Sequence, residues 1–362
     1  MSKKIDDLEI KTFFEEDSPE VPPPDIVAYN ELRSCADLHR MKTQGILDIQ
    51  PEFQREIVWK DADQTRFIDS LIKALPIPSK CFSLDYKTQK WQVIDGLQRM
   101  ATITRFLSGE KWILSRLEDI EPSLSGQPIS KFVDQNSELH SYYTRVENLT
   151  LPITVLRCDY TKKSHAFYLF TIFHRLNTGG MKLNNQEIRN CIYAGPFNNL
   201  LKELNKNTSW MKLNKMKSDI GYRFTKQELI LRLFTFHDRY NNYNGRLARF
   251  LNDYMADNIK LSTEELINKQ KLFERTVDIV FRKVFEGKTP PKMAISVFEA
   301  LLVGVSFNLK FLESQTVEQV KALYKKLLSH EELSDEKLSE GLSGKLRVQG
   351  RLSAANKVFS GK

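Results

Sequence analysis

The sequence predicts an α+β protein, in which a first domain with a small mixed sheet precedes an all-α helical domain. Short runs of β-branched and aromatic residues at 81–86, 91–94 and 151–156 read as strands and alternate with helical segments. From residue 196 onward, apolar residues recur at helical spacing. A chain of 362 residues is long enough for two domains, each with its own core.

The chain begins with an acidic segment. Residues 1–30 hold three lysines and eight carboxylates, and Pro22, Pro23 and Pro24 follow one another. Such a composition cannot bury much apolar surface. We therefore expect a flexible arm over 1–27, a first domain over 28–195 and a helical domain over 196–362.

The first domain should contain a helix, a hairpin and a returning strand. Asp61 or Asp63 can cap a helix with an apolar stripe at i, i+3, i+4 and i+7, which Pro76 stops. The runs 81–86 and 91–94 then form a hairpin. Residues from about 111 to 150 are mixed and polar, and we interpret them as an insertion with short elements.

Residues 95–99, Asp-Gly-Leu-Gln-Arg, are the most informative segment, and we call them the Asp95–Arg99 corner. Asp95-Gly96 is typical of a tight turn between the strand before it and a helix after it. Backbone N–H groups and the positive end of a helix dipole then meet, which favours an anion. Arg99 adds a planar cation suited to phosphate. An ordinary turn followed by a solvated arginine fits the same residues, so the motif alone leaves both interpretations open.

The next helices carry further candidate residues. Residues 164–176 form an apolar helix, and Asn177 and two glycines end it. Asn177 suits either a ligand contact or a helix end, and His174 suits either the same pocket or the core. Asn184-x-x-Glu187 predicts a capping box, so Glu187 is either a cap or a pocket carboxylate.

The helical domain is predicted from capping and periodicity. Thr225-x-x-Glu228 has the form of another capping box. Further helices are expected over 240–255, 271–287, 293–312 and 316–329.

The Asp95–Arg99 corner resembles the Asp-Gly-Gln-Gln-Arg signature of the GmrSD-type restriction-system N-terminal domain family, which has a ParB/sulfiredoxin-like fold. The resemblance covers residues of about 45–195. It extends in order and spacing to three other segments, Phe53–Trp59, Ser70–Pro78 and Phe173–Gly180 with Leu183 and Glu187. Leu97 stands where the family usually has Gln and where sulfiredoxins carry their catalytic Cys, so sulfiredoxin chemistry is excluded.

The resemblance implies a nucleoside triphosphate with Mg²⁺ as the ligand. Asp95 would bind the metal, Gln98 would position water, and arginines would hold phosphates. The catalytic residues would then be Asp95, Gln98 and Arg99. The cofactor-binding residues would be Arg55, Gly96, Arg99, Asn177 and His174.

The charge of the chain favours a polyanionic partner such as DNA. The formal net charge is +8, and because residues 1–30 carry −5, the remainder carries +13. Arg246 and Arg249 lie among tyrosines, and Arg347 and Arg351 lie near the carboxyl terminus, so these four are candidate DNA contacts. Tyrosines at such positions are also typical of seams between helices.

These observations predict a cytoplasmic defence protein, bacterial or phage-encoded, that binds and hydrolyses a nucleoside triphosphate. Its nucleotide state would control DNA recognition or a partner nuclease, and self-association is a further expectation. The partner DNA is a candidate for chemical modification, and the sequence does not distinguish modified from unmodified DNA. No apolar run approaches the ~18–20 residues needed to span a membrane. Neither a Walker loop nor a zinc-type Cys spacing is found, and no His-dependent nuclease domain is recognised.

Two other functions remain open at this point. The chain can be a non-enzymatic ParB-like DNA-binding or adaptor protein, which the apolar Leu97 favours. It can also be a stand-alone metal-dependent DNA nuclease that uses carboxylates such as Asp95 and Glu187.

Overall fold

A computed structural model of the chain describes residues 23–49, 59–176, 184–215, 225–338 and 341–361. Contacts divide them into two compact units, with the division at residues 179 and 180. We call these the sheet unit and the helical unit. The sequence-based boundary lies at residues 195 and 196, after rather than before the next helix.

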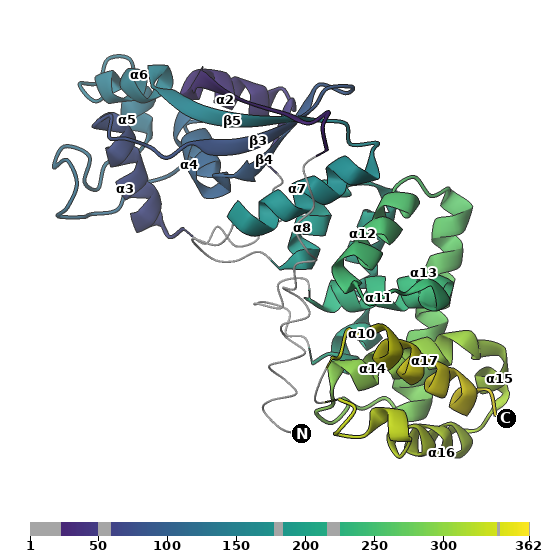
Figure 1. Cartoon of the computed structure of the whole chain (residues 1–362). Helices are drawn as coiled ribbons and strands as arrows, with labels where there is room; N and C mark the ends of the chain where they lie inside the picture. The colour runs from purple at the N-terminus through teal and green to yellow at the C-terminus, as the bar shows by residue number, and fades with distance from the viewer. Residues whose placement is uncertain (1–22, 50–58, 177–183, 216–224, 339–340, 362) are drawn as a thin grey trace. The chain divides into compact units, whose positions relative to one another are not determined.

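The sheet unit contains a five-stranded mixed sheet in the order β1-β5-β3-β4-β2 (Figure 1). The strands are β1 (Val27–Ser34), β2 (Leu47–Asp48), β3 (Lys80–Asp85), β4 (Lys90–Asp95) and β5 (Thr150–Cys158). β3 and β4 pair antiparallel as the predicted hairpin, and β5 returns parallel to β3. The α+β class and the small mixed sheet are therefore confirmed, whereas β1 and β2 are additions that the sequence analysis did not identify.

Six helices of the described residues accompany this sheet. They are α2 (Cys35–Thr43), α3 (Asp61–Ile72), α4 (Leu97–Leu107), α5 (Ser130–Val133), α6 (His140–Asn148) and α7 (Lys163–Leu176). Phe82, Val93 and Ile153 lie on one face of the sheet and pack into a single core with α2, α3, α4 and α6. Because side chains alternate along a strand, Ile94 lies on the other face, and α7 contacts β4.

The helical unit contains helices throughout its described residues. Its α-helices are α8 (Asn185–Ile192), α9 (Pro196–Leu204), α10 (Thr208–Leu213), α11 (Thr225–Arg239), α12 (Leu247–Asn258), α13 (Thr263–Asp278), α14 (Ile295–Phe307), α15 (Leu309–Ser314), α16 (Val317–Leu328) and α17 (Lys345–Phe359). Short 3₁₀ turns occur at Tyr240–Asn242 and Glu331–Leu333, and a π-helix continues α13 over Ile279–Val284.

Two differences from the predicted helices have local causes. The helix expected over 240–255 is interrupted because Gly245 has a φ of 96°, which an α-helix does not accept. α13 begins earlier than expected because Ser262 and Glu265 form a capping box.

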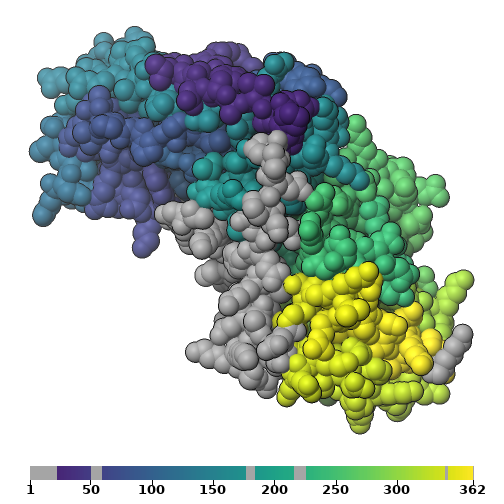
Figure 2. All heavy atoms as spheres, viewed as in Figure 1, coloured from purple at the N-terminus to yellow at the C-terminus, as the bar shows by residue number. Residues whose placement is uncertain are grey.

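The core of the helical unit includes a close packing of α14 against α17. α14 is buried along most of its length, and a Cβ added at Gly304 would lie 2.8 Å from the Cβ of Ala355. The yellow C-terminal helices form one contiguous block in Figure 2. Among the helices described, none combines the length and apolar character needed to cross a membrane.

Candidate functional site

The Asp95–Arg99 corner forms as predicted, with β4 ending at Asp95 and α4 starting at Leu97. Gly96 is the N-cap residue of α4 and has a φ of 95°, a left-handed conformation that favours glycine. Within the described residues, no side chain caps this helix end. The first N–H groups of α4 therefore have no side-chain cap, and the positive end of the helix dipole lies beside them.

Arg99 connects the end of β4 to the segment just before β3. Its Nη2 donates to Asp95 Oδ2 at 2.8 Å, and its Nη1 donates to the Pro78 carbonyl oxygen at 2.8 Å. The Arg99 side chain is 16% exposed and that of Asp95 35% exposed, so the pair lies at the protein surface. Solvent therefore reaches part of each side chain.

Lys80 lies against the Asp95–Arg99 corner and was missed by the sequence analysis. It is the first residue of β3 and is fully buried, and its Cγ would lie 2.9 Å from a Cβ added at Gly96. Within the described part of the chain, its Nζ has no hydrogen-bond partner. Burial, together with repulsion from Arg99, lowers the pKa of the Lys80 amine to about 8. The sequence offers one sign of this burial: Lys80, Phe82 and Leu84 occupy alternate positions of the strand and therefore share its core face.

Gln98 adds a second unpaired polar atom. Its Oε1 is buried and, among the described residues, accepts no hydrogen bond. Buried polar atoms in folded proteins are normally hydrogen-bonded, so each exception needs an explanation. Lys80 and Gln98 together give the corner one unpaired cation and one unpaired acceptor.

The electrostatics of the corner favour an anion. Lys80 and Arg99 contribute two cationic side chains, and α4 contributes the positive end of its dipole. The opposing negative charge comes from Asp95, which pairs with Arg99. Phosphate bound at a helix N-terminus and held by Lys and Arg is a common arrangement.

The remaining predicted ligand residues are not all described. Arg55 and Asn177 lie outside the described residues. His174 is half-buried in the last turn of α7. Glu187 forms the predicted capping box of α8, with the Asn184 N–H donating to Glu187 Oε2 at 2.6 Å. Of the two interpretations of Glu187, this geometry supports the helix cap and not the pocket carboxylate.

The sheet unit also contains a cavity of about 1000 Å³. It lies between β2 and the helices α3 and α4, with Trp59, Thr104 and Arg105 among its lining residues. Its described lining residues include none from the Asp95–Arg99 corner. The Arg105 guanidinium is already occupied, since it donates to Asp61 at 2.7 Å and stacks on Trp112.

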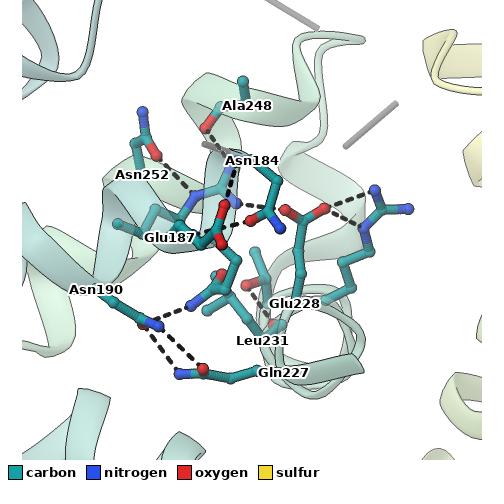
Figure 3. A network of polar contacts seen from close by, with 12 residues as sticks. Asn184, Glu187, Asn190, Gln227, Glu228, Leu231, Ala248 and Asn252 are labelled. Atoms are coloured by element: carbon teal, nitrogen blue, oxygen red, sulfur yellow. Dashed lines mark hydrogen bonds and ion pairs between the residues drawn. The ribbon is translucent and has the colours of Figure 1, made fainter. Parts of the chain in front are cut away.

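The helical unit contains a buried network of charged side chains (Figure 3). Glu228 accepts from Arg189 at 2.7 Å and from Arg232 at 2.7 Å. Arg232 also donates to Glu299 at 3.4 Å. The Glu228 carboxylate therefore lies in this network. The predicted capping box with Thr225 stays a prediction, because the Thr225 side chain lies outside the part of the chain that the structure describes.

Arg351 belongs to the same interior and not to the surface. It is 3% exposed, donates to the Leu342 carbonyl oxygen at 3.1 Å and lies 3.6 Å from Glu299. Its predicted contact with DNA is wrong for this conformation, because a polyanion cannot reach a buried guanidinium. The apolar residues of α17 on either side, such as Val348 and Leu352, hold it inward.

The other predicted DNA contacts lie nearer the surface. Arg246 is exposed, whereas Arg249 and Arg347 are half-buried, and Arg249 lies 4.0 Å from Asp253. The two basic segments meet, because a Cβ added at Gly245 would lie 3.3 Å from the backbone N of Lys345. The neighbouring tyrosines fill seams between elements: Tyr243 is buried and donates to the Ser343 carbonyl oxygen.

The metal-ligating side chains of the described residues are not grouped into a metal site. Within the described ranges, no group of three or more His, Cys, Asp or Glu side chains is placed to hold a metal ion. The four cysteines are buried and free, and burial raises the pKa of the Cys35, Cys81 and Cys158 thiols to about 12.

Comparison with known proteins gives one match. The family model described as the GmrSD restriction endonuclease, N-terminal domain, matches residues 35–194, which confirms the predicted resemblance. No curated protein and no solved structure matches the chain significantly. The matched range includes the whole Asp95–Arg99 corner and indicates a component of a restriction or defence system.

Proposed function

Because residues 35–194 match the N-terminal domain of GmrSD restriction endonucleases, we propose that the Asp95–Arg99 corner binds and hydrolyses a nucleoside triphosphate. The observation that carries this proposal is the uncapped start of α4 beside Arg99 and the unpaired Gln98 Oε1. A polyphosphate would satisfy the first N–H groups of the helix and accept hydrogen bonds from the guanidinium.

The residues of the corner would divide the work of phosphoryl transfer. Arg99 would release Asp95 and hold the phosphate oxygens. Gln98 would orient the attacking water through its unpaired Oε1. These roles require positioning and charge rather than a covalent intermediate.

Magnesium fits this corner as a companion of the ligand. Mg²⁺ usually keeps several waters and needs only one or two protein carboxylates besides the substrate phosphates. Asp95, with its exposed carboxylate, would be the protein ligand. When bound, the ion would neutralise charge that develops on the transferred phosphoryl group.

We further propose that nucleotide state in this protein is coupled to DNA. The support is the meeting of the two basic segments around Gly245 and Lys345, where Arg246 is exposed. The nucleotide state would control the activity of a partner nuclease or of a second copy of the chain, because restriction requires that DNA is cut.

The test is release of inorganic phosphate from nucleoside triphosphates with Mg²⁺, with and without modified DNA. We expect turnover by the wild type and a loss of about 100-fold in Asp95→Asn, since the metal loses its protein ligand. Asp119→Asn is the matched control, because Asp119 pairs with Arg66 on the same unit in a similar surface ion pair.

The outcome also separates the alternatives. Binding without phosphate release would favour the adaptor function, which the present Arg99–Asp95 pair supports because both groups are satisfied without a ligand. Metal-dependent DNA cutting by the purified chain would favour the nuclease. Equal turnover in Asp95→Asn and the wild type would contradict the proposed site.

A further inference from the structure

Lys80 packs against the Asp95–Arg99 corner, and neither the motif nor the proposed function gives it a role. Its amine is enclosed, unpaired within the described residues, and surrounded by groups that act on its charge. Those groups are Cys35 from α2, Asp95 from β4 and Arg99 from α4, while its register partner on β5, Ile153, is uncharged.

A buried cation without a partner destabilises the ligand-free protein. An ammonium group loses its free energy of hydration on burial. Only an ion pair with good hydrogen bonds compensates for that loss. Here Arg99 and the positive end of α4 add repulsion, and Asp95 already accepts a hydrogen bond from Arg99. The arrangement therefore lacks a negative charge at this point.

The contacts show where that charge would enter. Lys80 packs beside Gly96, and Arg99 reaches the carbonyl oxygen of Pro78, two residues before Lys80 in the chain. Arg99 thus links the segment just before β3 to Asp95 at the end of β4.

We propose that the Lys80 ammonium is the inner phosphate contact of the Asp95–Arg99 corner, reached by a polyphosphate when Arg99 leaves Pro78 for the ligand. This inference rests on the proposed function for the identity of the ligand, but it requires only the phosphate groups. Lys80 then gains a charge-assisted hydrogen bond that it lacks in the free protein.

Binding would be linked to the protonation of Lys80. Because its pKa in the free protein is about 8, part of the population loses the charge above that pH. A bound polyphosphate holds the proton, so its Kd should rise about tenfold between pH 7 and pH 9. Cys35 does not titrate in this window, since burial raises the pKa of its thiol to about 12.

The experiment compares the wild type, Lys80→Met and the control Lys131→Met, which removes an exposed lysine of the same unit. Calorimetry measures the Kd of inorganic tripolyphosphate and of a nucleoside triphosphate at pH 7 and pH 9, and thermal unfolding measures Tm without ligand. We expect Lys80→Met to weaken both ligands at pH 7 at least about tenfold, with no pH dependence and no loss of Tm. Lys131→Met should behave as the wild type does.

Each other result decides one of the two proposals. Equal Kd values in Lys80→Met and the wild type would overturn the role of Lys80 and leave nucleotide binding intact. Lys80-dependent tripolyphosphate binding without any preference for, or turnover of, a nucleotide would support Lys80 and contradict the proposed function. No binding by the wild type, or a lower Tm in Lys80→Met with unchanged pH dependence, would overturn this inference.

Discussion

At the scale of single residues, Gly96 and Lys80 depend on each other. Gly96 supplies the left-handed turn that starts α4, and its missing Cβ leaves room for the stem of Lys80. A side chain at position 96 would both strain the backbone and displace the lysine. The corner is therefore constrained by a contact between the start of β3 and the start of α4 as well as by turn chemistry.

Gly96→Ala should destabilise the protein more than Gly45→Ala does. Both positions have positive φ, so both variants pay about 1–2 kcal/mol for the left-handed conformation. Nothing lies within 4 Å of a Cβ at Gly45, whereas Lys80 lies at 2.9 Å from one at Gly96. Urea unfolding of the two variants measures the difference, and equal losses would contradict the contact.

The buried Lys80 predicts an unusual pH dependence of stability. Its pKa is about 8 in the folded protein, whereas an unperturbed lysine has a pKa of 10.5, so the unfolded chain binds more protons between these values. The free energy of unfolding should therefore rise as the pH increases from about 8 to 10.5, by up to about 3 kcal/mol from this group. Below pH 8 the full penalty of burying the charge is present.

The measurement is urea unfolding of the ligand-free wild type and Lys80→Met across this pH range. The difference between the two proteins isolates the contribution of the lysine from other titrating groups. A constant difference from pH 8 to pH 10.5 would show that the amine is not desolvated.

Glu228 gives a residue-scale prediction in the helical unit. It accepts hydrogen bonds from Arg189 and Arg232, and all three side chains are buried. Glu228→Gln should lower the free energy of unfolding by about 3–5 kcal/mol, because it removes the carboxylate that pairs with buried Arg189 and leaves buried Arg232 only the longer contact with Glu299. Glu203→Gln breaks an exposed pair with Lys206 and should have a far smaller effect. Similar losses in both variants would contradict the assigned role of the network.

At the scale of elements, the packing of α14 on α17 decides the form of the helical core. Gly304 lets the two helices approach closely, since its Cβ position is occupied by Ala355 and Phe359. Gly350 of α17 is different, because its nearest neighbour is not backbone but the carboxylate at the far end of the Glu332 side chain. A comparison of alanine substitutions at the two glycines therefore distinguishes the effect of helix propensity from the effect of packing between α14 and α17.

Gly304→Ala should destabilise the protein by about 1–3 kcal/mol despite the better helix propensity of alanine. Gly350→Ala should be neutral or stabilising. The Glu332 carboxylate can rotate away from the new methyl group, and alanine has a higher helix propensity than glycine. Thermal or urea unfolding of both variants tests this, and a stabilising Gly304→Ala would show that α14 and α17 can separate at no cost.

At the scale of the whole molecule, local patterns were predictable and long-range ones were not. The hairpin, α4 and α8 follow from turn residues, caps and periodicity within a few positions of each other. β1 was missed because its pairing partner β5 lies more than a hundred residues away. Lys80 was missed because its burial depends on other elements of the fold, among them Gly96 at the start of α4 and Cys35 at the start of α2.

Charge was the other source of error. A sequence gives no sign that Arg351 and Glu228 neutralise charge in a core, and arginine normally indicates a surface. The Asp95–Arg99 corner could be located because its strand, turn and helix are contiguous. Arg55, Asn177 and the role of any nucleotide remain predictions of the resemblance.

The most direct test of the central claim is calorimetric titration of a nucleoside triphosphate with Mg²⁺ into the wild type and Arg99→Ala. Arg66→Ala is the matched control, since Arg66 forms a surface ion pair with Asp119 in the same unit. The corner predicts binding by the wild type and Arg66→Ala and a Kd raised about 10- to 100-fold in Arg99→Ala. Equal affinity in all three proteins would place the phosphates elsewhere and contradict the site.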